Sequence, residues 1–141
     1  MDAQFLQKLI DEITDPQAGI YNVVYFYGNS KRITTIIDAI TSKCCNKKVV
    51  RTNGTDFREE TIQLILNRKM HMPECNLYSL ENIDKIAGME ANEQRLYGVL
   101  DWLMESGIQI VISGATPTKA IKKLAPRIRA QIDGGISFYV E

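Results

Sequence analysis

A short polar segment between two apolar stretches holds the residues best suited to bind phosphate. A phosphate-binding loop surrounds phosphate with backbone N–H groups at a helix N-terminus and adds a lysine that reaches the outer phosphates. Apolar residues 23–27 before the segment predict a buried strand, and an apolar-striped helix is predicted over residues 33–42 after it. The residues that could contact nucleotide are Gly28, Asn29, Ser30, Lys31, Arg32, Thr34 and Thr35.

The spacing of this segment departs from that of a working loop. Such a loop reads Gly-x4-Gly-Lys-Ser/Thr. Here the segment is at least a residue short, has no second glycine and carries Ile33 directly before Thr34. We therefore expect a tight turn over residues 28–31 in a nucleotide-binding fold that has lost its nucleotide. Weak binding of phosphate or ADP by Lys31, Arg32 and the helix N-terminus is the alternative.

Other side chains give little sign of catalysis. Glu81 and Asn82 follow a predicted strand, but a single carboxylate with neutral neighbours holds Mg²⁺ poorly without nucleotide phosphates. Glu81 is therefore interpreted as an exposed acid at the strand end. His71 is the single histidine, and the three cysteines, two of them adjacent, suit neither a disulfide framework nor a tetrahedral metal site. We predict no catalytic residue, no metal site and reduced thiols.

Basic residues gather near the C-terminus. Charged helix faces are usually only solvated, which is the interpretation we favour, and weak contact with DNA phosphates or with an acidic protein is the alternative. The run comprises Lys119, Lys122, Lys123, Arg127 and Arg129, and Lys43, Lys47 and Lys48 could join it in space.

The composition predicts one globular domain over residues 1–141. Hydrophobic residues make up 45% of the 16.0 kDa chain, enough for a real core. Basic and acidic residues balance at 17 each, so no overall field attracts nucleic acid or an anionic membrane. No apolar run approaches the about 18 residues of a membrane span, and the N-terminus lacks a signal pattern. We expect a cytoplasmic protein without membrane contact.

Strand-like and helix-like segments alternate along the chain. Apolar runs predict strands at residues 23–27, 48–52, 76–80, 108–113 and 136–140. Periodicity and capping signals predict helices at residues 4–13, 33–42, 56–69 and 90–106, one after Thr116-Pro117 and a short one from Pro126. The alternation predicts an α/β fold with a five-stranded parallel sheet and helices on both faces.

Three segments carry a family resemblance. Residues 76–90 read Asn-Leu-Tyr-Ser-Leu-Glu-Asn-Ile-Asp-Lys-Ile-Ala-Gly-Met-Glu, residues 109–118 read Gln-Ile-Val-Ile-Ser-Gly-Ala-Thr-Pro-Thr, and residues 124–136 read Leu-Ala-Pro-Arg-Ile-Arg-Ala-Gln-Ile-Asp-Gly-Gly-Ile. In order and spacing the chain resembles the AAA+ ATPase domain of the bacterial replication initiator DnaA and its shortened relative Hda. The resemblance implies a three-layer αβα P-loop NTPase core.

The resemblance also assigns the family's active positions. The metal-coordinating Asp corresponds to Glu81, and the acid that polarises the attacking water corresponds to Asn82, whose amide cannot act as a base. The first sensor Asp falls at Ala115, with Ser113 and Gly114 before it.

The arginine finger and the lid of the family are further points of departure. The finger corresponds to Gln131, although Arg127, four residues earlier, matches an arginine of the family. An uncharged amide cannot stabilise the charge that develops during phosphoryl transfer. The family's helical lid has no counterpart in these 141 residues, so the expected fold has no lid domain.

Three functional hypotheses follow from the residues and the resemblance. The first is a non-catalytic protein-binding or regulatory factor linked to replication initiation, whose partner is a DnaA-like or helicase-related protein and which needs no cofactor. The second is a switch that still binds ATP or ADP, with Thr34 and Glu81 on Mg²⁺. The third is an accessory factor that contacts DNA through the helix near Lys122. Oligomerisation is left open.

Overall fold

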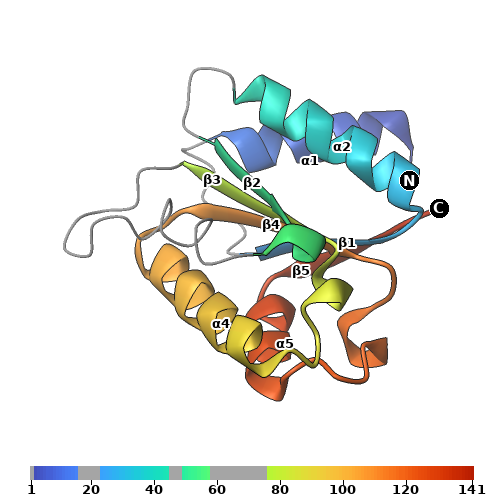
Figure 1. Ribbon diagram of the computed structural model, residues 1–141. Coiled ribbons are helices and arrows are strands. Elements are labelled where there is room, and N and C mark those ends of the chain that lie inside the picture. The colour runs from blue at the N-terminus through green and yellow to red at the C-terminus, as the bar shows by residue number, and fades with distance from the viewer. Residues whose placement is uncertain (1, 16–22, 45–48, 58–75) are drawn as a thin grey trace.

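The computed structural model describes residues 2–15, 23–44, 49–57 and 76–141. Five parallel strands form one sheet in the order β2-β3-β4-β1-β5 (Figure 1). The strands are β1 (Val23–Gly28), β2 (Val49–Asn53), β3 (Leu77–Glu81), β4 (Gln109–Gly114) and β5 (Ile136–Val140). The helices of the described part are α1 (Ala3–Thr14), α2 (Ser30–Lys43), α4 (Glu90–Glu105) and α5 (Pro126–Asp133). The predicted α/β class and the five-stranded parallel sheet are confirmed.

The interior strand β1 is apolar because both faces of the sheet are covered. Val23 to Phe26 are fully buried, and β1 pairs with β4 on one side and with β5 on the other. Val24 lies opposite Val111 of β4 and Ile136 of β5. A parallel strand buried on both faces needs a continuous apolar run, and that run is what made this strand predictable.

Helices cover both faces of the sheet in two separate layers. Figure 1 shows α1 and α2 above the sheet and α4 and α5 below it. Alternate residues of β1 divide the core: Val24 and Phe26 pack with α1 and α2, whereas Val23 and Tyr25 pack with α4 and α5. The predicted three layers are therefore confirmed. None of the described helices is long and apolar enough to cross a membrane.

Two local predictions were wrong. The turn over residues 28–31 is shorter than expected, because α2 already begins at Ser30 with Asn29 as its N-cap. Asparagine is a favoured N-cap because its side chain accepts a hydrogen bond from a free backbone N–H of the first turn. The helix expected after Thr116-Pro117 is only a 3₁₀ turn over Thr118–Ala120, and the side chain of its preceding residue makes no capping hydrogen bond.

Several predictions fall outside the described residues. The helix expected over residues 56–69 is described only at its first two positions, where Asp56 ends a 3₁₀ turn that begins at Gly54. His71, Lys47, Lys48 and two of the three cysteines also lie outside the described ranges. Cys44, the remaining cysteine, is buried at the end of α2.

Candidate functional site

The candidate site is a cavity of about 290 Å³ at the carboxyl end of the sheet. In parallel α/β sheets this end is where ligands bind, because strand ends and helix N-termini meet there. The cavity brings together predicted residues from three separate segments: the start of α2, the end of β3 and the end of β4. Its described lining consists of Ser30, Ile33, Thr34, Glu81, Asn82, Ser113, Gly114 and Ala115.

The connection from β1 to α2 consists of Asn29 alone. The backbone N–H of Asn29 donates to the carbonyl oxygen of Val140 at 2.9 Å, and its side-chain oxygen accepts from the backbone N–H of Arg32 at 3.2 Å. Gly28 has φ +122°, and a Cβ there would lie 2.1 Å from the Val140 carbonyl oxygen. The chain therefore passes directly from strand to helix, against the end of β5.

Neither cation of the predicted phosphate segment lines the cavity. Arg32 donates from Nη1 to the backbone oxygen of Glu141 at 2.9 Å, and both Arg32 and Lys31 are exposed. Thr35 donates its hydroxyl to the carbonyl oxygen of Lys31, within its own helix. Of the described residues that line the cavity, none carries a positive charge. Of the seven residues predicted to contact nucleotide, Ser30 and Thr34 line the cavity, and the apolar Ile33 lies between them in the lining.

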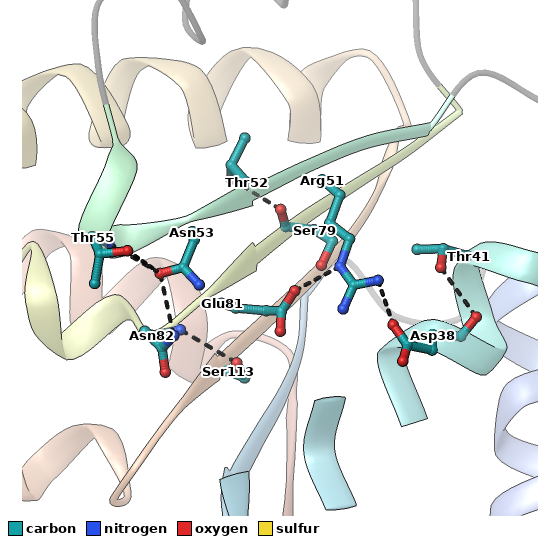
Figure 2. A network of polar contacts seen from close by, with 10 residues as sticks. All are labelled: Asp38, Thr41, Arg51, Thr52, Asn53, Thr55, Ser79, Glu81, Asn82 and Ser113. Carbon is teal, nitrogen blue, oxygen red and sulfur yellow. Dashed lines mark hydrogen bonds and ion pairs between the residues drawn. The ribbon is translucent and has the colours of Figure 1, made fainter. Parts of the chain in front are cut away.

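Glu81 is held by an arginine from the neighbouring strand. Arg51 donates from Nε to Oε1 of Glu81 at 2.7 Å and from Nη1 to Oδ1 of Asp38 at 2.6 Å (Figure 2). The hydrogen bond with Glu81 raises the pKa of the Arg51 guanidinium above its usual range. The side chain of Glu81 is only 12% exposed. The prediction of a solvent-exposed strand-end acid was wrong, because the ion pair with Arg51 allows the carboxylate to be mostly covered.

Asn82 joins the ends of three strands. Its backbone is left-handed, with φ 58°, a conformation that asparagine tolerates better than most residues. Its side-chain nitrogen donates to Oδ1 of Asn53 at 3.2 Å, and its backbone N–H donates to Oγ of Ser113 at 3.4 Å (Figure 2). The same Asn53 oxygen accepts from the backbone N–H of Thr55. At this position the amide thus serves as a structural tie between β2, β3 and β4.

Sequence reasoning missed Arg51, Asp38 and Asn53. An Asn-Gly pair such as Asn53-Gly54 is typical of a turn, but nothing in the sequence indicates that the Asn53 side chain accepts from Asn82. Arg51 and Asp38 are ordinary charged residues in a predicted strand and a predicted helix. Only the parallel pairing of β2 with β3, with α2 packed over the sheet, brings them together.

The arginine-finger region packs within the chain. Gln131 donates from Nε2 to the carbonyl oxygen of Tyr97 at 3.1 Å, and the Arg127 guanidinium carbon lies 4.6 Å from the centre of the Tyr97 ring. Tyr97 belongs to α4, so both side chains contact the neighbouring helix. The start of α5 is also fixed by α4, because buried Glu93 accepts from the backbone N–H of Ala125 at 2.7 Å.

The basic run does not act as one surface. Arg129 donates to the backbone oxygens of Thr118 and Ile121, at 3.2 and 3.0 Å. Lys43 lies on α2, in the other helix layer, where it pairs with Asp11. The idea that Lys43 joins the run was therefore wrong. The exposed lysines of the run are Lys119, Lys122 and Lys123.

Comparison with known proteins decides the family. The sequence model of the bacterial DnaA ATPase domain matches residues 2–139. The chain belongs to this family. The chromosomal replication initiator DnaA of Thermomicrobium roseum is 34% identical over 134 residues, which is 88% of this chain and 29% of that protein. The chain spans about 30% of the length of the curated DnaA relatives that it matches.

Solved DnaA structures share the fold of this family member. A DNA replication initiation factor superposes with a TM-score of 0.79 at 16% identity, over 98% of this chain and 44% of that one. A DnaA bound to AMPPCP and single-stranded DNA superposes with a TM-score of 0.77 at 16% identity, over the same shares. The DnaA-like AAA+ resemblance and the nucleotide-binding fold are confirmed.

Proposed function

We propose that this DnaA-family domain is a non-catalytic factor that binds proteins of the replication machinery without a nucleotide in its cavity. One observation carries the proposal: the phosphate-binding loop is reduced to Asn29. A working loop presents several unpaired backbone N–H groups to phosphate. Here the N–H of Asn29 is bonded to Val140, and the N–H of Arg32 is bonded to the Asn29 side chain. The residues present do not fit a triphosphate.

The charges around the cavity support the same proposal. A bound nucleoside triphosphate needs cations to balance its negative charge. The described lining of the cavity includes no lysine or arginine and contains one acid, Glu81. Arg51 already neutralises that acid at 2.7 Å, so a magnesium ion would have to compete with a fixed guanidinium. The binding of Mg²⁺ by Thr34 and Glu81 is accordingly disfavoured.

At three positions that the family resemblance assigns to catalysis, the side chain present cannot perform the required step. Asn82 has no carboxylate to orient water, Ala115 has no polar side chain, and Gln131 is uncharged and bonded to α4. The loss of each such electrostatic group can lower the rate of hydrolysis by a factor of about 10²–10³. The proposal therefore predicts no ATP hydrolysis above background.

The cavity itself favours a second candidate, a nucleotide-responsive switch. It lies at the N-terminus of α2, where a helix attracts anions, and the solved DnaA neighbour was bound to AMPPCP. On this hypothesis nucleotide would change the affinity for the protein partner. A third candidate, contact with DNA through Lys119, Lys122 and Lys123, has three exposed lysines in its favour.

Partner binding with and without nucleotide tests the proposal. The purified chain is titrated against the replication initiator and the replicative helicase of its own cell, in buffer, in ADP and in ATP with Mg²⁺. We expect saturable binding to one of them, with affinities equal within about twofold in all three solutions because the cavity stays empty. A tenfold dependence on nucleotide supports the switch instead. Binding to neither protein contradicts the partner class.

A matched variant separates the DNA-contacting candidate. Lys122→Glu/Lys123→Glu reverses two exposed charges and leaves the core untouched. We expect its protein-binding affinity to match that of the wild type. Salt-sensitive binding of single-stranded DNA by the wild type that this variant abolishes supports the DNA candidate.

A further inference from the structure

β5 forms one edge of the described sheet and pairs there only with β1, with Gly28 opposite Val140. The carbonyl oxygen of Val140 accepts from Asn29, so the backbone groups of Val140 face β1. Bonding direction alternates along a strand, so Ser137 and Tyr139 turn their N–H and C=O groups away from β1. In the described part of the chain no backbone hydrogen bond reaches these outward groups.

Exposed aromatic side chains flank this edge on both faces of the sheet. On the α1 side Phe5 lies against Phe138, with ring centres 5.8 Å apart, and is 47% exposed. On the opposite face Tyr139 lies 5.5 Å from the ring centre of Tyr27 and is 57% exposed. Proteins usually protect an edge strand with lysine, proline or a bulge, whereas β5 reads Ile-Ser-Phe-Tyr-Val.

An apolar groove of about 290 Å³ lies between α1 and β5. Its described lining is Phe5, Lys8, Leu9, Glu12, Ile136 and Phe138. The two charged side chains on its α1 wall, Lys8 and Glu12, form no ion pair with any described residue. They are four residues apart, which is about 6 Å along a helix. The groove therefore presents one unpaired cation and one unpaired anion beside an apolar surface.

An extended strand is the element that fits the backbone of β5. A segment added to a sheet edge supplies N–H and C=O groups at the spacing that Ser137 and Tyr139 present. Its side chains alternate between the two faces of the sheet, so every second one lies on the groove side. Because Phe5 is exposed there, the groove favours an apolar residue at one of those positions.

The charges on α1 favour a strand of a different protein over β5 of a second copy. Residues on one face of a strand recur about every 6.6 Å, which is close to the separation of Lys8 and Glu12 along α1. An acid and a base two positions apart on the added strand can therefore pair with both. β5 of a second copy lacks them, because its groove-side residues are Ile136, Phe138 and Val140.

We propose that β5 binds an extended segment of the protein partner. The segment pairs with the backbone of Ser137 and Tyr139, and its groove-side residues comprise an apolar residue, an acid opposite Lys8 and a base opposite Glu12. This inference rests on the proposed function, because the occupant is the replication protein that binds the chain there. The surface shares no residue with the described lining of the cavity at the carboxyl end of the sheet, so binding is independent of nucleotide.

Edge variants test the surface. The whole chain is titrated against the replication initiator and the replicative helicase of its own cell, and the protein that binds is kept for all variants. Ser137→Pro removes an outward N–H and no bond to β1, an orientation in which edge strands tolerate proline. We expect its dissociation constant to rise roughly fivefold or more, because a backbone bond to the partner is lost. Ser137→Ala keeps the N–H and should bind as the wild type does.

Charge variants test the chemistry of the segment. Lys8→Glu should weaken binding several-fold, because a like charge then meets the acid of the partner. Lys8→Glu/Glu12→Lys should bind no better than Lys8→Glu, because both charges are then opposed by their own sign. Lys122→Glu/Lys123→Glu is the matched control, since it reverses exposed charges outside the groove lining and should keep the wild-type affinity.

Amide hydrogen exchange followed by NMR gives a readout that a general loss of fold would not produce. When the partner is added, the amides of Ser137 and Tyr139 should exchange about tenfold more slowly or better, because each becomes hydrogen-bonded. Should Ser137→Pro fail to fold by circular dichroism, Tyr139→Lys replaces it and must weaken binding.

Three results would overturn the inference. Partner binding that is unchanged in the edge variants and in Lys8→Glu overturns it and leaves the proposed function standing. Wild-type binding to neither protein contradicts both. Self-association of the wild-type chain in analytical ultracentrifugation that Ser137→Pro abolishes assigns the edge to a second copy instead.

Discussion

Arg51 is the residue that joins two charged side chains from different layers of the fold. It lies on β2 and contacts Glu81 of β3 at 2.7 Å and Asp38 of α2 at 2.6 Å. The two contacts differ in their exposure to water, because the side chain of Glu81 is 12% exposed and that of Asp38 is 59% exposed. Solvent screens the second pair more strongly than the first.

Replacement of Arg51 by methionine should lower stability clearly. Arg51→Met leaves the mostly covered Glu81 carboxylate without its cation, which costs about 2 kcal/mol in the free energy of unfolding. Asp38→Asn is the matched control, because it removes only the exposed pair and should cost less than about 1 kcal/mol. Urea unfolding measures both. Equal losses would show that Glu81 does not depend on Arg51.

Tyr25 makes the stability of the fold depend on pH in alkaline solution. Its hydroxyl donates to the backbone oxygen of Thr116 at 2.6 Å. Burial raises the pKa of Tyr25, and the charges of Asp84 and Asp133 add to the effect. The folded state therefore holds this proton more tightly than the unfolded state. Its contribution to stability is complete below the unfolded pKa of about 10 and is lost as the pH rises through the folded value.

The Tyr25→Phe variant tests this pH dependence of stability. At neutral pH it should unfold about 1–2 kcal/mol more easily, since the Thr116 carbonyl loses its donor. The difference from the wild type should narrow above about pH 10, because only the wild type must keep the Tyr25 proton. Urea unfolding at a series of pH values measures the difference. A gap that stays constant into alkaline solution contradicts the assignment.

At the scale of elements, the connection from β1 to α2 is the most distinctive feature. Gly28 can approach the end of β5 because it has no Cβ and adopts φ +122°. Asn29 then caps α2 and bonds to Val140. This arrangement occupies the place where a nucleotide-binding relative would need a longer loop.

Gly28→Ala should be far more harmful than the same change elsewhere. Its Cβ would lie 2.1 Å from the backbone oxygen of Val140, so we expect a loss of at least about 2 kcal/mol in the free energy of unfolding. Gly98→Ala in α4 is the matched control. Apart from the backbone of its own helix, no atom of the described residues lies within 4 Å of its added Cβ, and alanine should stabilise the helix by about 0.5–1 kcal/mol. Thermal unfolding measures both variants. A melting temperature that changes in the same direction in both would contradict this view of the connection.

The sequence predicted elements well where one residue pattern determined them. The apolar run of β1 and the proline at the start of α5 were sufficient, because buried parallel strands and helix N-termini have strong local signals. The 3₁₀ turn at Thr118–Ala120 was mistaken for a helix because Thr116-Pro117 resembles a helix start. The early start of α2 could have been read from Asn29, a favoured N-cap.

The candidate site was predictable only in part. The strand-end positions of Glu81, Asn82 and Ser113 follow from strand prediction, since carboxyl ends of parallel strands meet. The pairing of Glu81 with Arg51 could not be predicted, because it depends on strand register and on the packing of α2. The tie between Asn82 and Asn53 likewise needs the final geometry.

At the scale of the whole molecule, the chain keeps the sheet and both helix layers of a DnaA ATPase domain around a cavity that is poor in phosphate ligands. The polar side chains at the strand ends bond mainly to one another (Figure 2). Polar side chains that are hydrogen-bonded to one another favour a single arrangement. We infer that this cavity edge contributes to stability where a catalytic relative would use it for chemistry.

Calorimetric titration with nucleotide tests directly whether the cavity binds ATP or ADP. The chain is titrated with ATP and Mg²⁺ and with ADP, and the DnaA that was solved with AMPPCP serves as the positive control. We expect no saturable heat from this chain up to nucleotide concentrations on the order of 1 mM, which corresponds to less than about 4 kcal/mol of binding free energy. Saturable binding at micromolar nucleotide would contradict this expectation.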